Sequence, residues 1–403
     1  MKISFQRKID RYIGAFICRI LSLFYRKSRD EDDGFQPKKF LVILLSEMGS
    51  LVLAYPMFQQ IKKRYPGAEL YGLLFDKNKE ILTLLNVTPE KNILTVRDTT
   101  FGAFTIDCLR ALNQIRKLKL DVAIDCELFA RISSIISFLS GARIRVGFHP
   151  HTQEGLYRGT FINRPVLFNP YHHISRQFLN LVSAIDSVST PMVKQAARHN
   201  NLKPPAIEFA AAEIEAMLRD LRADFPVIDG KKLILVYPGG GILPIRAWPR
   251  HYYSQVAGEL IKKGYAVGIV GLVADKALAT AILTDCNHPA CIDLTGYTRS
   301  VRELMLIFHL AKLLITNDGG PGQFAALTPV PTIIFYGPET PDLYGPVDDK
   351  ATLFYNPLPC SPCLTAYNHR NSPCDGDNVC LKQIPPQQVL KSALQILEGG
   401  RSA

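Results

Sequence analysis

Apolar residues along this chain form short continuous runs that alternate with stretches of helical periodicity. The runs at residues 40–45 and 233–237 have the length of one strand and contain no charged residue. Both faces of such strands must be buried, as in parallel sheets that helices cover on each side. Amphipathic stretches follow the runs, so the pattern predicts an α/β fold with doubly wound sheets. Ligands bind such sheets at the carboxyl ends of the strands.

The alternation occurs twice along the chain. The first series predicts strands at 40–45, 70–75, 92–96, 121–124 and 144–148, and helices at 51–64, 103–118 and 130–139. The second predicts strands at 233–237, 266–270, 292–294, 313–316 and 332–335, and helices at 252–263, 276–284, 301–310 and 323–327. Between the two series, Pro204 and Pro205 precede a predicted helix at 210–222. We therefore predict Rossmann-like domains at 38–205 and 231–403, joined by a linker and helix at 206–230.

The segment 1–30 is basic and amphipathic. Residues 1–29 hold eight Lys and Arg and one acid, Asp10, which accounts for seven of the net eleven positive charges. Apolar side chains recur there at helical spacing: Ile13, Phe16, Ile17, Ile20, Leu21 and Phe24. Arg19 interrupts this stretch, which is shorter than the roughly 20 apolar residues of a spanning helix and does not read as a signal peptide. We interpret it as a helix lying on a membrane surface; the alternative is a helix packed on the protein itself.

Nine cysteines, an odd number, in a chain without a secretion signal indicate the cytoplasm. Four of them cluster in a Pro-, Asn- and Asp-containing loop at 360–380, in the pattern C-x2-C-x10-C-x5-C: Cys360, Cys363, Cys374 and Cys380. Four thiolates meet the count for a tetrahedral structural zinc, and His369 is a possible substitute ligand. A disulfide or redox role, or unligated thiols, are the alternatives.

Two glycine-rich segments follow buried strands in the second series. YPGGGILPIRAW at 237–248 contains Gly239, Gly240, Gly241 and Arg246; ITNDGGPGQFAA at 315–326 contains Asp318, Gly319 and Gly320. Glycines let backbone amides approach an anion closely, and the arginine fork suits phosphate oxygens. The segments therefore predict a site for a diphosphate. The alternatives are a purely structural turn and, for Asp318, a helix N-cap. A third segment, FYGPETPDLYGP at 335–346, leaves its strand in a tight Gly-Pro loop.

These three segments resemble glycosyltransferase family 9, which contains the lipopolysaccharide heptosyltransferases. The resemblance extends to SEMGSLVLAYPMFQQIKKRYPGAEL near the N-terminus and to LTGYTRSVRELMLIFHLAKLLITNDGGPGQFAA later in the chain. The resemblance implies a GT-B fold, in which two Rossmann-like domains face a central cleft. It places the nucleotide-sugar donor on 231–403 and the acceptor on 38–205, and it implies inversion without a metal, so that catalysis requires no cofactor. By motif, Arg246 matches the family's basic phosphate-binding residue, and Asp318, Gly319 and Gly320 match its donor-binding turn.

Two positions depart from the family pattern. Where the family has Gly-Asp, with the Asp as proposed catalytic base, this chain has Gly49 and Ser50. A serine cannot act as a base unaided, so our hypothesis is that Glu47, in the same loop, takes that role. The catalytic candidates are therefore Glu47, Ser50 and Arg246. The alternative is that Glu47 only caps the following helix. Gln323 stands where the donor-binding turn usually has histidine, and it cannot become cationic near pH 7. ADP-heptose is therefore only one of the possible donors.

Acceptor-binding candidates lie in the first domain. Glu127 and Arg131 follow a predicted strand end, and His173 lies in the family-like segment NPYHHIS. Further cationic or hydrogen-bonding groups occur in the same half: Arg143, Arg145, Arg158 and His172. Such residues suit a phosphorylated, lipid-linked saccharide, although solvated surface charge explains many clusters of this kind.

The sequence thus predicts an inverting glycosyltransferase that moves heptose or a related sugar from a nucleotide diphosphate to a lipopolysaccharide core or other envelope glycan. Its partners would be the nucleotide sugar, the lipid-linked acceptor and the inner-membrane surface. Nucleic acid is not expected, because the basic residues are concentrated in one short arm. The alternatives are a catalytically inactive binding protein for sugar nucleotides or glycans, and an enzyme of the nucleotide-sugar epimerase type.

Overall fold

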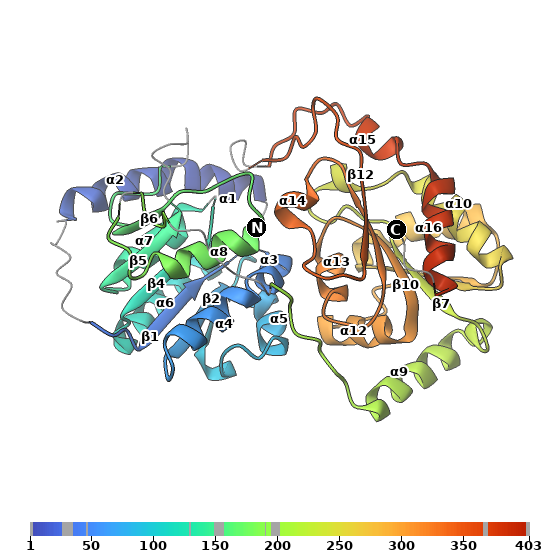
Figure 1. Ribbon diagram of the computed structural model, residues 1–403, viewed down its shortest axis with the longest axis horizontal. Helices are drawn as coiled ribbons and strands as arrows, with labels where there is room; N and C mark the ends of the chain where they lie inside the picture. The colour runs from blue at the N-terminus through green and yellow to red at the C-terminus, as the bar shows by residue number, and fades with distance from the viewer. Residues whose placement is uncertain are drawn as a thin grey trace. The chain divides into compact units, whose positions relative to one another are not determined.

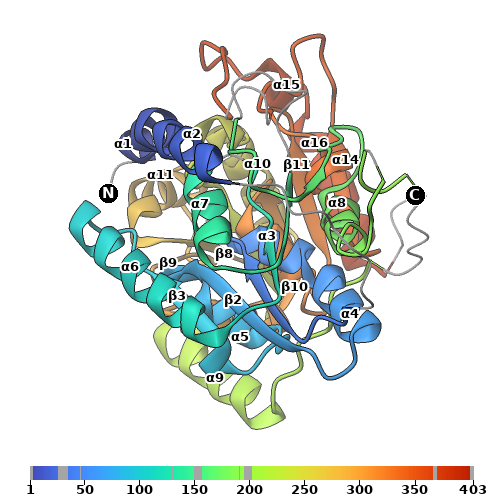
Figure 2. The same cartoon turned by 90° about the vertical axis from the view of Figure 1, so that its left-hand side faces the viewer.

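A computed structural model describes residues 3–25, 35–45, 47–128, 130–148, 157–189, 191–194, 202–365 and 370–399. The chain divides into two compact units, Met1–Leu202 and Lys203–Ala403. Each unit, in its described part, contains one six-stranded parallel sheet with helices on both faces (Figures 1 and 2). The predicted α/β class is therefore confirmed.

The sheet of the first unit has the strand order β3-β2-β1-β4-β5-β6. Its strands are β1 Lys39–Ile43, β2 Glu69–Phe75, β3 Ile93–Val96, β4 Val122–Asp125, β5 Ile144–Phe148 and β6 Arg164–Val166. The longer helices of this unit are α4 Tyr55–Arg64, α6 Phe101–Leu118, α7 Arg131–Leu139 and α8 Ile174–Ser183; two short ones are α3 Met48–Leu53 and α5 Lys79–Leu84. Three consecutive segments begin the chain: α1 Ile3–Ile9, the π-helical turn η1 Asp10–Gly14 and α2 Ala15–Phe24. They lie alongside α7 (Figures 1 and 2).

The sheet of the second unit has the equivalent order, β12-β11-β10-β7-β8-β9. Its strands are β7 Leu233–Tyr237, β8 Ala266–Gly271, β9 Cys291–Thr295, β10 Ala311–Asn317, β11 Thr332–Tyr336 and β12 Ala351–Tyr355. The helices are α9 Ala211–Asp224, α10 Arg250–Lys262, α11 Lys276–Cys286, α12 Val301–Leu310, α13 Gly320–Ala325, α14 Pro341–Tyr344, α15 Val379–Lys382 and α16 Pro386–Leu397. Helix α9 is the predicted helix of the linker, and it belongs to this unit.

Most predicted elements occur within a few residues of their expected bounds, and β5, β7 and α12 occur at those bounds. The helix expected at 51–64 is instead two helices, α3 and α4, because Pro56 lies in the first turn of α4. A proline has no amide hydrogen to donate and clashes with the carbonyl four residues earlier, so it starts a new helix. The helix expected at 323–327 begins earlier, at Gly320.

Both sheets have a topological switch point, where the chain leaves the centre first in one direction and then in the other. In the first unit this point lies between β1 and β4, and in the second unit between β7 and β10. Ligands of doubly wound sheets bind at the carboxyl ends of the two strands that flank this point. The switch points therefore locate one candidate site in each unit.

Candidate functional site

In the second unit, the two predicted glycine turns leave β7 and β10, the strands that flank the switch point. The side chain of Asn317, the last residue of β10, joins them. Its Nδ2 donates to the carbonyls of Pro238 (3.1 Å) and Gly239 (2.9 Å). Its Oδ1 accepts a hydrogen bond from the amide of Trp248 at 2.8 Å. The two turns therefore lie side by side, as the diphosphate interpretation requires.

The backbone of the 239–241 turn needs glycine at two positions. A Cβ on Gly240 would come within 2.7 Å of the carbonyl oxygen of Leu243 and 2.8 Å of the Cα of Pro244. Gly241 has a φ of +60°, in the left-handed region that other residues adopt at a cost. The glycines thus allow the chain to fold back so that Arg246 stands near the ends of β7 and β10.

Arg246 lies between two buried carboxylates. Its Nε is 3.4 Å from Oδ2 of Asp318, and its Nη2 is 3.3 Å from Oε1 of Glu339, in the loop after β11. Arg370, from the cysteine-rich loop, brings its own Nε to 3.3 Å from the same Glu339 oxygen. The four side chains are between 2% and 15% exposed. Their formal charges cancel, so the carboxylates hold two guanidinium groups in place without giving the site a net charge.

Glu339 and Arg370 are the functional candidates that sequence reasoning missed. Glu339 lies in a segment we interpreted only as turn chemistry, and Arg370 lies among cysteines that attracted a metal interpretation instead. The sequence around Glu339 and around Arg370 contains no motif that indicates a functional role for either residue. The pairing depends on the loop 360–380 packing beside β11, where the amides of Cys363 (2.9 Å) and Leu364 (2.8 Å) donate to the carbonyl of Pro338.

Gln323 is also at this site, on α13 and 5% exposed. Its Nε2 donates to the carbonyl of Tyr344 at 2.8 Å, and the hydroxyl of Tyr336 donates to the same carbonyl at 3.2 Å. Burial, together with the nearby Asp318 and Glu339, holds the pKa of Tyr336 well above its ordinary value, so the phenol stays protonated. The Oε1 of Gln323 is buried and accepts no hydrogen bond from the described residues. A buried acceptor of this kind costs about 1–3 kcal/mol unless a donor reaches it, which is what a bound hydroxyl or amine would supply.

In the first unit, the loop that carries Glu47 starts at the switch point between β1 and β4. The amide of Leu45 donates to Oε1 of Glu127 at 2.7 Å, and the carbonyl of Leu45 accepts from Nδ2 of Asn78 at 2.7 Å. Glu47 follows, and its Oε2 accepts a hydrogen bond from the hydroxyl of Ser50 at 2.9 Å. Within the described residues, the Glu47 side chain makes no capping hydrogen bond to α3. Two of the predicted catalytic residues are therefore in direct contact.

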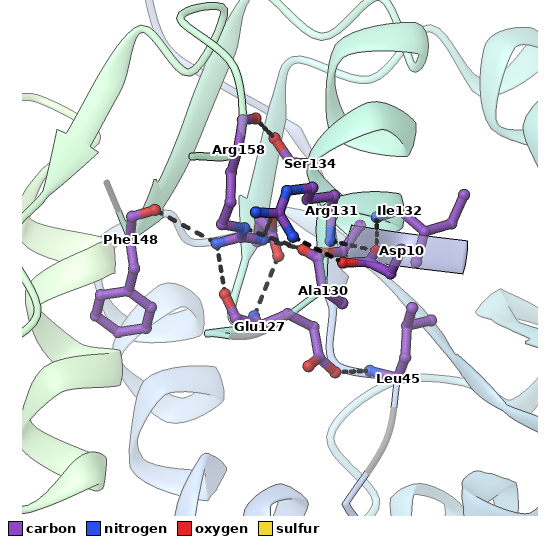
Figure 3. Close-up of polar contacts among 11 residues, drawn as sticks. Asp10, Leu45, Glu127, Ala130, Arg131, Ile132, Ser134, Phe148 and Arg158 are labelled. Atoms are coloured by element: carbon purple, nitrogen blue, oxygen red, sulfur yellow. Dashed lines mark hydrogen bonds and ion pairs between the residues drawn. The ribbon is translucent and has the colours of Figure 1, made fainter. Parts of the chain in front are cut away.

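A buried ion pair adjoins Glu127, and Figure 3 shows its arginine, Arg158, with the backbone carbonyls around it. Asp125, the last residue of β4, pairs with Arg158; these side chains are 0% and 2% exposed. The Arg158 guanidinium also donates to the carbonyls of Glu127 (2.5 Å), Ala130 (3.0 Å) and Phe148 (3.3 Å). Arg158, grouped in the sequence with possible acceptor-binding cations, is thus part of the core of the unit. Because only 2% of its side chain is exposed, its contacts give it a structural role in this unit.

The other acceptor candidates also have structural contacts. Arg131, 6% exposed, donates from Nε to the carbonyl of Tyr157 at 2.8 Å and pairs through Nη1 with Asp10 at 3.3 Å (Figure 3). His173 is the residue before α8, and its Nδ1 accepts from the amide of Ser175 at 3.3 Å. Glu127 is 5% exposed. Their acceptor-binding roles stay predictions, and these contacts supply a structural reason for the same residues.

Comparison with known proteins identifies the family of this chain. The sequence profile of glycosyltransferase family 9 (heptosyltransferase) matches residues 108–372. This chain belongs to glycosyltransferase family 9. It is 24% identical to lipopolysaccharide heptosyltransferase 2 of Salmonella typhimurium over 369 residues, which cover 89% of this chain and 98% of the relative.

Solved structures of family 9 enzymes share the fold. The structure of Escherichia coli ADP-heptose LPS heptosyltransferase II aligns with a TM-score of 0.70 at 20% identity, over 90% of this chain and 99% of that one. Escherichia coli heptosyltransferase WaaC, solved with ADP-2-deoxy-2-fluoro heptose, aligns with a TM-score of 0.60 at 14% identity, over 89% and 99% of the two chains. The GT-B fold predicted from the sequence is confirmed.

The cysteine-rich loop of this family 9 protein packs against the donor-site candidates. The Nδ2 of Asn378 donates to the carbonyl of Ile245 at 2.6 Å. Burial raises the pKa of the Cys380 thiol, and Cys363, Cys360 and Cys374 add to that rise, so the four thiols share one neighbourhood. His369 lies outside the described residues. Among the residues that are described, no group of three His, Cys, Asp or Glu side chains is placed to hold a metal ion. Zinc therefore stays a prediction, and it requires these thiols to close around the ion.

Proposed function

We propose that this protein transfers heptose or a related sugar, with inversion and without a catalytic metal, from a nucleotide diphosphate to a lipopolysaccharide core or other envelope glycan. Family membership supports the transfer chemistry, and the names of the relatives support the substrate class. The observation that carries the proposal is the arrangement at the switch point of the second unit. There, two glycine turns, Arg246 and Arg370 gather at the carboxyl ends of neighbouring parallel strands.

The proposed chemistry divides between the two units. Arg246 and the turn amides stabilise the negative charge that develops on the departing diphosphate. Asp318 and Glu339 keep the guanidinium oriented, and Oε1 of Gln323 accepts a hydrogen bond from the donor. Glu47 removes the proton from the acceptor hydroxyl as that oxygen attacks the anomeric carbon. The hydrogen bond from Ser50 holds the Glu47 carboxylate in one orientation.

A Glu47→Gln variant is expected to lose about 100- to 10,000-fold in kcat, because glutamine keeps the shape of the side chain but cannot accept a proton. Donor binding is expected to stay near wild type, since Glu47 belongs to the first unit and the donor candidates to the second. Steady-state kinetics and calorimetric titration with the nucleotide diphosphate measure the two quantities separately.

Ser50→Ala is the matched control for this variant. It removes the 2.9 Å hydrogen bond to Glu47 but leaves the carboxylate. We expect a much smaller fall in kcat than for Glu47→Gln, because the base itself remains. Turnover by Glu47→Gln at the wild-type rate would assign the proton transfer to another group.

The donor is identified by thermal-shift measurements with ADP, UDP and GDP and with their sugar conjugates. ADP-heptose is the first candidate, because WaaC was solved with an ADP-linked fluoro-heptose. The UDP and GDP forms are also tested, because Gln323 stands where the family's donor-binding turn usually has histidine. Absence of a response to every nucleotide would contradict the proposal.

Two alternative functions predict results that differ from those of a transferase, once the nucleotide that binds is known. A catalytically inactive binding protein would respond in the thermal-shift assay but transfer no sugar to a lipid-linked acceptor; Ser50 in place of the family Asp motivates this alternative. An epimerase-type enzyme would convert the free nucleotide sugar without any acceptor. Incubation of donor with and without acceptor, followed by chromatography of the sugars, separates all three.

We also propose a structural zinc bound by Cys360, Cys363, Cys374 and Cys380. Protein purified without chelator is expected to contain about one zinc per chain by elemental analysis, the count that one four-thiolate site predicts. Cys363→Ser is expected to lose the zinc, whereas Cys108→Ser, on α6 in the other unit, is expected to keep it. A wild-type protein without zinc would leave a disulfide or free thiols as the remaining interpretations.

A lipid-linked acceptor would place the reaction at the cytoplasmic side of the inner membrane. In the described part of the chain, no helix is both long and apolar enough to span a bilayer.

A further inference from the structure

The N-terminal helices present an apolar stripe to solvent. Seven of the eighteen large hydrophobic side chains recorded as exposed in the described residues belong to the first 24 positions. They are Phe5, Tyr12, Ile13, Phe16, Ile20, Leu23 and Phe24, and Leu23 reaches 83% exposure. From Ile13 onward their spacing places them on one face of the helix. A contiguous exposed apolar surface of this kind marks an interaction site.

The opposite face of α2 is held by the protein. Gly14 and Cys18 are buried, and Ile17, Leu21 and Tyr25 pack in a cluster with Ile135 of α7 and with Phe161. This arrangement corrects one aspect of the sequence expectation, which treated Ile17 and Leu21 as part of the same outward stripe. Helix packing on the protein and an outward apolar face, stated as alternatives, are both present.

Hydrogen bonds fix the orientation of the N-terminal helices, with the apolar stripe facing solvent. Oδ1 of Asp10 accepts from the amides of Arg131 (2.7 Å) and Ile132 (3.2 Å), the first residues of α7, and so caps that helix (Figure 3). The hydroxyl of Ser22 hydrogen-bonds to that of Tyr157 at 2.8 Å and accepts from the amide of Thr160 at 3.0 Å. The stripe therefore needs a partner outside this unit.

Charge decides which partner fits. Lys8, Arg11 and Arg19 are exposed on the N-terminal helices. Asp10 is the one acidic residue among residues 1–29, and it forms an ion pair with Arg131. In a symmetric pair of chains, the same face of both copies would meet, and these cations would repel one another. Anionic lipid headgroups instead complement the cations, while the acyl region accepts the apolar side chains.

We infer that the outward face of residues 5–24 docks on the surface of an anionic phospholipid leaflet, with Phe16, Ile20 and Leu23 inserted below the headgroups. Because the helix caps α7 and packs against it, docking orients the whole first unit, rather than a tethered arm, against the bilayer. The inference concerns lipid binding alone and does not depend on the donor or the acceptor.

The test uses the full-length protein and vesicle flotation without nucleotide or sugar. We expect binding to phosphatidylglycerol-containing vesicles to be at least about tenfold tighter than to pure phosphatidylcholine, and to weaken as salt is raised from about 0.1 to 0.5 M. Phe16→Ser/Leu23→Ser is expected to weaken binding to anionic vesicles by about tenfold or more, because two inserted side chains are lost. Lys8→Gln/Arg19→Gln is expected to reduce the preference for anionic lipid.

The matched control is Ile106→Ser/Leu109→Ser on α6, where the side chains are 49% and 62% exposed but lie outside the stripe. This variant is expected to bind vesicles like wild type. Equal losses in both apolar variants, or no binding by the wild-type protein, would overturn the inference. So would a dimer in lipid-free solution that Phe16→Ser/Leu23→Ser dissociates, because the stripe would then belong to a second copy. A protein that binds vesicles but transfers no sugar would contradict the proposed function alone.

Discussion

Arg246→Gln is expected to lower kcat/KM for sugar transfer by about 100- to 1,000-fold, the range found when a group that stabilises developing charge is removed from an enzyme. The structure places the effect toward the upper end. Without the guanidinium, Asp318 loses its contact with Arg246 beside the proposed diphosphate site, whereas Glu339 keeps its contact with Arg370. Arg246→Lys is expected to recover only part of the loss, because an ammonium group cannot reach two partners as the arginine fork does. Steady-state kinetics with the donor that the thermal-shift panel identifies measure both variants.

Arg250→Gln is the control for this prediction. It lies at the start of α10, a few residues after Arg246, with 42% of its side chain exposed and a partner, Asp285, outside the site. Its kcat/KM is expected to match that of the wild type. A value for Arg246→Gln within threefold of wild type, in protein with unchanged thermal stability, would show that the leaving group is stabilised elsewhere.

Arg158→Gln is expected to lower the free energy of unfolding of the first unit by about 3–5 kcal/mol, the usual cost of leaving one member of a buried ion pair without its partner. Asp125 is fully buried, and the variant also weakens contacts to three backbone carbonyls. In a urea denaturation experiment, two spectroscopic signals distinguish the unfolding of the two units. Far-ultraviolet circular dichroism follows both, whereas the single tryptophan, Trp248, reports on the second unit.

We therefore expect an earlier dichroism transition and a nearly unchanged fluorescence transition. Arg110→Gln on α6, where 70% of the arginine side chain is exposed, is expected to change stability by less than about 0.5 kcal/mol. An Arg158→Gln protein as stable as this control would mean that Asp125 is neutral or solvated in the folded state. Asp125→Leu/Arg158→Met is expected to be more stable than either single variant, because no buried charge is left alone.

The strand pattern was predictable because the central strands are buried on both faces. β1 and β7 lie in the middle of their sheets, so residues 40–43 of β1 and the whole of β7 are continuously apolar and stand out. β6 and β12, two of the four edge strands, were missed, whereas the other two, β3 and β9, were predicted. β6 has three residues, one of them Pro165, and β12 is only partly buried along its length. An edge strand has less apolar surface to bury and therefore a weaker pattern.

The position of the two glycine turns was also predictable, since each turn follows a strand closely. The pairing of Arg246 with Glu339 was not, because these residues are 93 positions apart. The contact of Asp10 with the start of α7 spans 121 positions. No local pattern indicates which of many charged residues will meet across such distances.

By itself, then, the sequence determined that this protein has two doubly wound α/β units, and that glycine turns stand at strand ends in the second. These features follow from short-range periodicity and from backbone conformations that few residues adopt. The tertiary structure decided the remainder: the order of the strands, the charges that face each other at the two switch points, and the face of the N-terminal helices that stays exposed. Each of these depends on which elements pack together, and packing joins residues that are distant along the chain.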